Sequence, residues 1–221
     1  MKHFNQYYNE ITKCHLFSDM SCIQVTRALE LLHHKFSKYA KNQYLHRSDE
    51  NFDCFGLVLY GRVKVMIDDI EGNSAIMSEV TAGNTFGESL CFMKRNDSNV
   101  YILASEDCGV VWLSPSELFQ DRKSELKSEI ERRFVEMLAS RTLVMNDRIQ
   151  ILSKLTLREK IITFLTFSKR DAGCNELDIP LSREEMSLYF GTNRSALSRE
   201  LSHLRSEGLI DYKRNHFKIL F

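Results

Sequence analysis

The chain of 221 residues has no net charge, because 30 lysines and arginines balance 30 aspartates and glutamates. It contains no apolar run approaching the roughly 18 residues of a membrane span, so no membrane partner is expected. Its first ten residues, MKHFNQYYNE, are polar and aromatic, so we expect no secretory signal and a cytoplasmic protein. A hydrophobic fraction of 43% and a charged fraction of 27% are typical of a globular protein with one large or two modest domains.

Cysteine pairs at metal-binding spacing are also missing. The six cysteines include no Cys-x-x-Cys pair: Cys14, Cys22, Cys54, Cys91, Cys108 and Cys174. We therefore expect free thiols rather than an iron–sulfur cluster, with a redox-sensitive thiol as an alternative. Four histidines are interpreted as surface or core side chains, so neither haem nor a metal site is predicted: His15, His33, His34 and His46. No nucleophile–base signature or phosphate loop is present, and we do not expect an enzyme.

Two short helices joined by a glycine are predicted between Leu181 and Ile210. Ser182 is a candidate N-cap for a first helix over Arg183–Phe190, whose two early glutamates suit the helix dipole. Gly191 supplies the backbone freedom that a tight turn between helices needs. This layout is typical of a helix-turn-helix that reads DNA.

The second helix of this motif has a polar, arginine-bearing outer face. Either Thr192 or Asn193 caps it, and it runs to about Glu207 before Gly208. Its apolar positions form one stripe, made of Ala196, Leu197, Leu201 and Leu204. The positions left for the outside are Arg194, Ser195, Ser198, Arg199, Ser202 and Arg205. Arginine suits guanine in the major groove and serine can bond a base or a phosphate, whereas an ordinary solvated face would not explain the capped turn.

A short hairpin with a basic tip follows this helix. Strands are predicted over Leu209–Tyr212 and Phe217–Phe221, with Lys213 and Arg214 between them. Residues 192–221 contain six lysines and arginines but only three acidic residues. A local excess of positive charge is what non-specific DNA affinity requires, so a neutral chain is no objection. The hairpin is interpreted as the wing of a winged helix.

The first half of the chain changes from helical to strand texture. Residues 4–36 are predicted to be helical, with core candidates Phe17, Ile23, Val25, Leu29 and Leu32. Between residues 38 and 113 the pattern is one of short strands separated by turns, for example Phe55–Leu59 and the alternating Val63–Ile67. Many short strands at this spacing predict a barrel or jelly roll.

A long helix is predicted from Ser114–Pro115 to about Lys154, with a break near Asp121–Lys123. One apolar stripe runs along it: Phe134, Leu138, Met145, Ile149 and Leu152. We interpret the stripe as a dimer interface; the alternative is that it packs only on its own barrel. Thr156 is expected to cap a further helix through about Ser168, and a short strand is predicted at Leu177–Pro180.

Barrel, long helix and winged helix in this order resemble the Crp/Fnr family of bacterial transcription regulators. The resemblance covers nearly the whole chain and rests on LYGRVKV at Leu59–Val65, AGNTFGES at Ala82–Ser89 and TNRSALSREL at Thr192–Leu201. It implies arginines of the recognition helix at Arg194 and Arg199. The family's frequent glutamate between them is Ser195 here, so the resemblance implies a different base preference.

The effector is not assigned by the resemblance. The phosphate cassette of cyclic-nucleotide-binding members matches Gly87 and Glu88, but a gap-free count puts Ser98 and Asn99 where those members have arginine and serine. A buried phosphate needs a cation, and Arg95 lies three residues early, so cyclic AMP is disfavoured. The effector pocket is accordingly predicted to contain Gly87, Glu88, Ser89, Ser98 and Asn99.

The sequence thus predicts an α+β protein with an N-terminal β-roll or jelly-roll barrel, a long dimerisation helix and a C-terminal winged helix-turn-helix. The expected domains are residues 1–115, 116–154 and 155–221. The expected function is a homodimeric transcription regulator that binds a palindromic operator, contacts RNA polymerase and senses a small molecule or redox state. A cyclic-nucleotide-binding signalling module that uses its winged helix for protein contacts is the alternative. The predicted DNA contacts are Thr192, Asn193, Arg194, Ser195, Ser198, Arg199, Ser202, Lys213 and Arg214.

Overall fold

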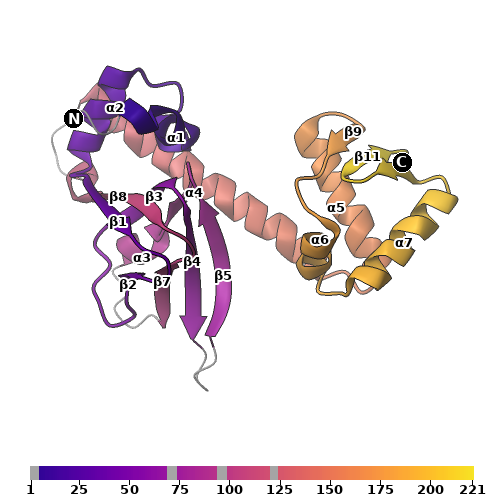
Figure 1. Ribbon diagram of the computed structural model, residues 1–221. Helices are drawn as coiled ribbons and strands as arrows, with labels where there is room; N and C mark the ends of the chain where they lie inside the picture. The colour runs from indigo at the N-terminus through magenta and orange to yellow at the C-terminus, as the bar shows by residue number, and fades with distance from the viewer. Residues whose placement is uncertain (1–4, 69–73, 94–98, 120–123) are drawn as a thin grey trace. The chain divides into compact units, whose positions relative to one another are not determined.

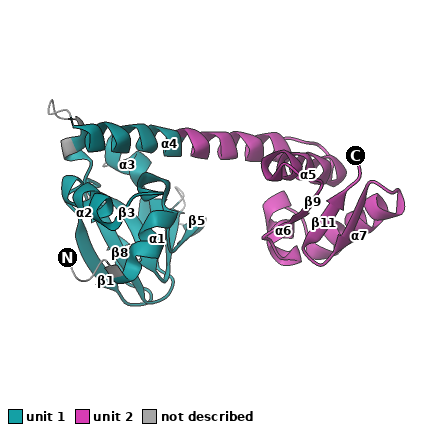
Figure 2. Ribbon diagram, turned by 90° about the horizontal axis from the view of Figure 1, so that it is seen from above, with its two compact units in different colours: residues 1–138 teal, residues 139–221 magenta. Residues whose placement is uncertain are grey.

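The computed structural model describes residues 5–68, 74–93, 99–119 and 124–221 (Figure 1). The chain divides into two compact units, Met1–Leu138 and Ala139–Phe221, each with its own hydrophobic core (Figure 2). Among the described residues, no helix is long and apolar enough to cross a membrane.

Short helices open the first unit: η1 (Asn5–Tyr7), α1 (Tyr8–Lys13), η2 (His15–Phe17) and α2 (Cys22–Leu31). A capping box begins α2, since Ser21 and Gln24 each bond the other's backbone N–H. Four of the five predicted core residues are buried in this region, namely Phe17, Val25, Leu29 and Leu32. The prediction for Ile23 is wrong, because it lies in the first turn of α2 with 68% of its surface exposed. The expected helical region also extends too far, since strand β1 begins at Lys35.

Two four-stranded antiparallel sheets form the barrel. One has the order β1-β8-β3-β6, with bounds β1 (Lys35–Tyr39), β8 (Cys108–Leu113), β3 (Phe55–Tyr60) and β6 (Thr85–Phe86). The other has the order β2-β7-β4-β5, with bounds β2 (Tyr44–His46), β7 (Val100–Ala104), β4 (Arg62–Asp68) and β5 (Ser74–Thr81). A short helix, α3 (Glu88–Met93), follows β6. The predicted β-roll is therefore confirmed.

The long helix is α4 (Glu125–Leu152), preceded by a single 3-10 turn, η3 (Ser116–Phe119). The helix start predicted at Ser114–Pro115 is thus only this short turn, and the predicted break at 121–123 lies outside the described residues. The boundary between the two units falls inside α4, after Leu138. One helix therefore contributes Ile130 and Met137 to the first core and Ile151 to the second.

The predicted apolar stripe of α4 divides into two parts. Phe134 is only 4% exposed, and its ring lies 5.5 Å from that of Phe55; Leu138 packs partly buried against the same core. The prediction that Phe134 faces a second chain needs correction, because its ring is buried within its own unit. Met145 and Ile149 are 67% and 62% exposed, and Leu152 is also exposed.

The second unit is a helical domain with a small sheet. It contains α5 (Leu157–Ala172), β9 (Glu176–Asp178), α6 (Arg183–Phe190), α7 (Arg194–Ser206), β10 (Ile210–Lys213) and β11 (His216–Ile219). The sheet order is β10-β11-β9, all antiparallel. Thr156 caps α5 through a capping box, as predicted, but the helix continues past Ser168 and ends where Gly173 adopts a φ of 65°. The order of elements is that of the predicted winged helix-turn-helix.

Candidate nucleic-acid interface

Local capping sets the geometry of the α6–α7 pair. The Ser182 hydroxyl accepts a hydrogen bond from the Glu185 N–H at 3.2 Å, while the Ser182 N–H donates to the Glu185 carboxylate at 2.7 Å. Gly191 ends α6 with a φ of 66°, the left-handed conformation that glycine adopts most easily. The Asn193 side chain then accepts from the Ala196 N–H at 2.8 Å. Of the two caps that the sequence left open, Asn193 is the one that begins α7.

The buried side of α7 follows the predicted stripe. Leu197, Leu201 and Leu204 are fully buried in the core of the second unit, and Ala196 is partly buried. The three leucines pack in a cluster that also contains Phe190 of α6 and Phe217 of β11. Burying this stripe fixes the rotation of α7 about its axis, so the opposite side must face outward.

That outward side carries five residues that we call the recognition face: Arg194, Ser195, Ser198, Arg199 and Ser202. All five are exposed. Two of the serines make local bonds, from Ser195 Oγ to the Asn193 side chain at 2.7 Å and from Ser202 Oγ to the Ser198 carbonyl at 2.9 Å. In the part of the chain that the structure describes, the side chains of Arg194 and Arg199 form no hydrogen bond or ion pair. Both guanidinium groups are free to bind a ligand from solution.

A third outward arginine of α7 is engaged instead. Arg205 Nε lies 2.8 Å from an Asp211 carboxylate oxygen, and its guanidinium carbon lies 5.4 Å from the centre of the Tyr212 ring. These contacts hold the end of α7 against β10. Arg205 therefore acts in the structure of the domain, which distinguishes it from Arg199 one and a half turns earlier.

The acidic residues of this region are neutralised away from the recognition face. Arg158 of α5 lies 3.5 Å from the Glu200 carboxylate and also bonds Glu207. The hydrogen bond from Arg158 lowers the pKa of the Glu207 carboxyl below its ordinary value. Together with the pair between Arg205 and Asp211, these contacts engage the three carboxylates between residues 192 and 221, so among the described residues none of the three pairs with Arg194 or Arg199.

The wing is the hairpin of β10 and β11 with its two-residue tip, Arg214–Asn215. Lys213 and His216 are the last paired residues before the tip. Lys213 and Arg214 are exposed, and neither side chain has a hydrogen bond or ion pair among the described residues. A depression of about 570 Å³ lies beside the tip and is lined by Asp178, Arg183, Lys213, Arg214, Asn215 and His216. The predicted basic wing tip is therefore present as an exposed cationic surface.

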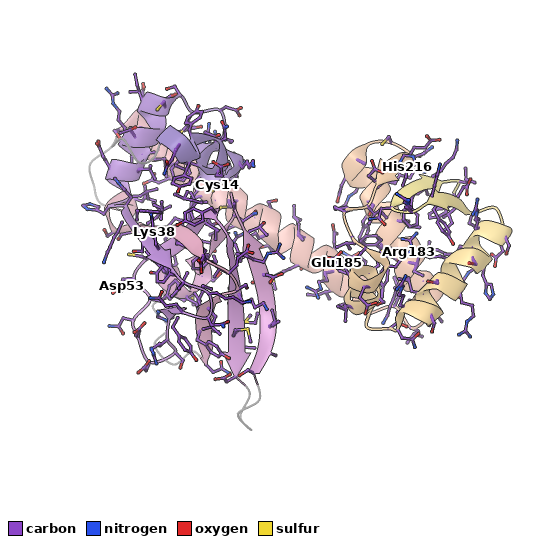
Figure 3. The ribbon with its side chains drawn as sticks, in the orientation of Figure 1. Cys14, Lys38, Asp53, Arg183, Glu185 and His216 are labelled. Atoms are coloured by element: carbon purple, nitrogen blue, oxygen red, sulfur yellow. The ribbon has the colours of Figure 1, made fainter. Side chains whose placement is uncertain are left out.

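Arg183 is a residue of this region that the sequence did not single out. It opens α6 (Figure 3). Its guanidinium carbon lies over the rings of Tyr212 and Phe217, at 5.1 and 5.0 Å from their centres. Burial lowers the pKa of Arg183 from its ordinary value. The sequence held one usable signal, an arginine at the first helical position after a cap, but the contact with strands some thirty residues later is long-range.

The predicted effector residues are not gathered in the same way. Gly87 adopts a φ of 81°, and Glu88, at 2% exposure, begins α3. Ser89 is exposed, and Ser98 lies outside the described residues. The Asn99 amide donates to the Asp68 carbonyl, and the Asp68 N–H donates back to the Asn99 carbonyl at 3.0 Å. The Asn99 side chain thus ties β4 to the start of β7, and its place in the effector pocket stays a prediction.

Aromatic rings occupy the space beside Gly87. A side-chain carbon at Gly87 would lie 2.3 Å from the Phe52 ring. Phe52 in turn packs edge-on against His46 at 4.4 Å and near Trp112 at 6.1 Å. His46 is buried, and burial lowers its pKa below the ordinary value, although Glu50 lies 3.6 Å away and opposes this effect. The Gly87 turn thus borders a packed aromatic cluster.

Among the residues that the structure describes, the thiols and acidic groups form no cluster suited to a metal. None of the six cysteines forms a disulfide, and Cys14, Cys91 and Cys108 are buried. Burial raises the pKa of Cys108 to about 11, which keeps this thiol protonated. Within residues 5–68, 74–93, 99–119 and 124–221, no three His, Cys, Asp or Glu side chains lie close enough to hold a metal ion.

Two family models match the chain. The cyclic nucleotide-binding domain matches residues 36–122, which cover the barrel, and the Crp-like helix-turn-helix domain matches residues 159–220. Among curated relatives, the cAMP-activated global transcriptional regulator CRP of Salmonella typhimurium is 25% identical over 184 residues, which cover 81% of this chain and 87% of that protein.

Solved structures have the same fold. A CprK protein complexed with OCPA matches with a TM-score of 0.63 and 15% identity, covering 89% of this chain and 88% of that one. A CooA mutant from Carboxydothermus hydrogenoformans matches with a TM-score of 0.56 and 21% identity, covering 91% and 92%. With both domain models matched in the order barrel then helix-turn-helix, this chain belongs to the Crp/Fnr family of DNA-binding transcription regulators, which is not a family of enzymes.

Proposed function

We propose that the protein is a homodimer that binds a pseudo-palindromic DNA site through α7 and the wing, under the control of a signal received by the barrel. The observation that carries this proposal is the recognition face, on which Arg194 and Arg199 are exposed and unpaired among the described residues. A buried leucine stripe fixes the orientation of this face. The first turns of such a helix are the part that enters the major groove.

The proposal divides the DNA contacts into two kinds. Arg199 reads a base, because a guanidinium can bond guanine O6 and N7 together, and Ser195 and Ser198 bond bases or phosphates beside it. Lys213 and Arg214 at the wing bind phosphates, which fix position but carry no sequence information. Thr192 and Asn193 lie at the start of α7, where the helix N-terminus favours a phosphate. The Thr192 N–H already donates to the Ser187 carbonyl at 2.9 Å, so the contact of Thr192 is assigned to its hydroxyl.

Alanine variants of Arg199 and Lys213 test this division. An operator is first selected from random DNA, and affinities are then measured on that operator and on unrelated DNA. Arg199→Ala is expected to cost about 1–3 kcal/mol on the operator and to relax the preference at one base pair in each half-site. Lys213→Ala is the matched control and should weaken both DNAs equally. Equal losses on both DNAs for Arg199→Ala would remove Arg199 from base reading.

The dimer is proposed to form through the part of the α4 stripe that follows Phe134, in which Leu138 is partly buried and the later residues are exposed. Leu138, Met145, Ile149 and Leu152 recur at spacings of seven, four and three, which keeps them on one side of a helix. Met145 and Ile149 are large apolar side chains left in solvent, as expected for a surface that a second copy covers. A dimer also supplies two recognition helices, whose half-sites lie about 34–36 Å apart along DNA.

Charged substitutions at the exposed stripe test the dimer. Met145→Glu combined with Ile149→Glu should yield monomers in sedimentation and much weaker binding to the selected operator. Val144→Glu is the matched control, because Val144 is also 66% exposed on the same helix but lies off the stripe. A double variant that sediments as an unchanged dimer would place the interface elsewhere.

For the signal, we propose a small molecule or a redox change sensed in the barrel, with cyclic AMP disfavoured. The match to a cyclic nucleotide-binding domain and the cAMP-activated relatives support a small-molecule signal. Asn99 occupies a position at which cyclic-nucleotide-binding members have a side chain that binds the phosphate, yet its amide is bonded to the Asp68 carbonyl. A signal that shifts α4 would change the spacing of the two recognition helices. RNA polymerase is the further partner that we propose for the DNA-bound dimer.

A further inference from the structure

The tip of the wing adopts a strained backbone conformation. Arg214 has a φ of 56°, the left-handed region that favours glycine and asparagine, because it occupies the first of the two positions of a tight hairpin turn. An arginine there costs free energy that a glycine would not, so contacts elsewhere must stabilise the turn. The tip carries two such contacts, one from α6 and one from the end of β9.

The contact from α6 is made by Arg183. Its Nη2 donates to the Arg214 carbonyl at 2.7 Å, and its Nη1 lies 3.2 Å from the Met186 sulfur. The guanidinium carbon also lies over the neighbouring rings of Tyr212 and Phe217, one from each strand of the wing. Among the described residues no carboxylate pairs with Arg183. Its charge is balanced by ring faces and one carbonyl, all belonging to the wing.

The second contact gives a local probe of the tip. The Ile179 N–H, just after β9, donates to the Asn215 carbonyl at 2.9 Å. At the other end of β11, the Ile219 N–H donates to the Asn175 carbonyl at 2.8 Å. These two amides report separately on the tip and on the base of the same strand.

We infer that Arg183 is a positioning residue of the wing, which holds the strained Arg214 turn in place before DNA arrives. The inference rests on the proposed role of the wing in binding phosphate. A hairpin already held in one conformation loses less conformational entropy on binding, so its cations bind phosphate more tightly. A planar guanidinium suits this task because it can cover two rings while donating within its own plane, which an ammonium cannot do.

Amide exchange of the full chain without DNA, followed by NMR, tests the positioning role. Arg183→Met keeps an unbranched stem but removes the donor and the charge. We expect the Ile179 amide to exchange on the order of tenfold faster, because the turn loses one hydrogen bond from a charged donor. The exchange rate of the Ile219 amide should not change. Arg183→Lys should behave like Arg183→Met, and Arg199→Met is the matched control that leaves both amides unchanged. Unchanged exchange at Ile179, equal acceleration at Ile219, or full rescue by lysine would overturn the inference.

A double-mutant cycle separates positioning from direct DNA contact. Arg183→Met should weaken operator binding by about tenfold in the natural wing and by much less once Lys213→Ala and Arg214→Ala are present, because Arg183 acts through those side chains. A loss of the same size in both backgrounds would mean that Arg183 binds DNA itself, and the inference would fail. If the two wing alanines alone leave DNA affinity unchanged, the proposed phosphate contacts fail, and the NMR result still decides the positioning role.

Discussion

The recognition face of α7 and the Gly87 turn of the barrel were both predicted as binding sites, but their predicted residues differ in exposure and in the bonds they make. On α7, five polar side chains face solvent together, and Arg194 and Arg199 have no partner in the described ranges. At the barrel, Glu88 is buried, Ser89 is exposed and Asn99 bonds the backbone of β4. A surface on one helix is specified by a few neighbouring residues, whereas a pocket depends on loops closing from distant parts of the chain.

This difference also concerns stability, since the two regions have separate cores. Phe55 is fully buried in the first unit and Leu201 in the second. Phe55→Ala should cost about 3–5 kcal/mol and Leu201→Ala about 2–5 kcal/mol, as truncations of buried side chains generally do. Each should lower the unfolding free energy of its own unit. Trp112, the single tryptophan, lies in the barrel and reports on that unit by fluorescence.

Two separate cores predict that the two units unfold separately. With Leu201→Ala, the Trp112 fluorescence transition in urea should stay in place while operator binding is lost. Phe55→Ala should move that transition to lower urea. A shift of the Trp112 transition by Leu201→Ala as large as that by Phe55→Ala would show one cooperative structure instead of two.

The parts of the fold that were predictable are those set by short-range rules. The capped turn at Ser182 and Gly191, and the leucine stripe of α7, follow from local hydrogen bonding and a 3.6-residue period, and both are confirmed. The choice of Asn193 over Thr192 as the cap was left open, because both residue types can accept the same backbone bond.

Three features that the sequence analysis did not foresee depend on tertiary contacts: the exposure of Ile23, the burial of Phe134 and the bond made by Asn99. Ile23 matches a core pattern but lies on the outer side of α2, since a helix of ten residues exposes part of its apolar surface. Phe134 continues the predicted dimer stripe in sequence, yet in the structure its ring packs against Phe55 and Phe92. Asn99 is bonded by Asp68, thirty-one residues earlier. Periodicity in the sequence cannot identify contacts between residues that lie far apart in the chain.

A smaller effect is expected from a change of chemistry on the recognition face itself. Ser195 stands where the resemblance to the family implies a frequent glutamate. Ser195→Glu should shift the preferred base by about 1–3 kcal/mol toward a cytosine, whose amino group a carboxylate accepts. Selection of binding sites from random DNA by the natural chain and the variant measures the shift.

The control for this exchange is a glutamate on α7 outside the recognition face. Ser206→Glu adds the same charge in the last turn of the helix, so it should lower affinity through repulsion without altering the selected sequence. If both variants select the operator of the natural chain, Ser195 does not face the bases, and the orientation proposed for α7 in the groove is wrong.

The smallest expected effect is at the barrel, where cyclic nucleotides should produce no binding heat in the low-micromolar range. A cyclic phosphate is an anion, and enclosing it without a paired cation costs several kcal/mol. The Gly87 turn and the start of α3 offer backbone donors, which permit weak binding at most, and the Asn99 amide is engaged by Asp68. Calorimetry with cyclic AMP and cyclic GMP measures this, with the Salmonella typhimurium CRP as positive control. A micromolar dissociation constant that survives Ser98→Ala and vanishes with Arg95→Ala would show that Arg95 supplies the cation and that the gap-free alignment of the cassette is wrong.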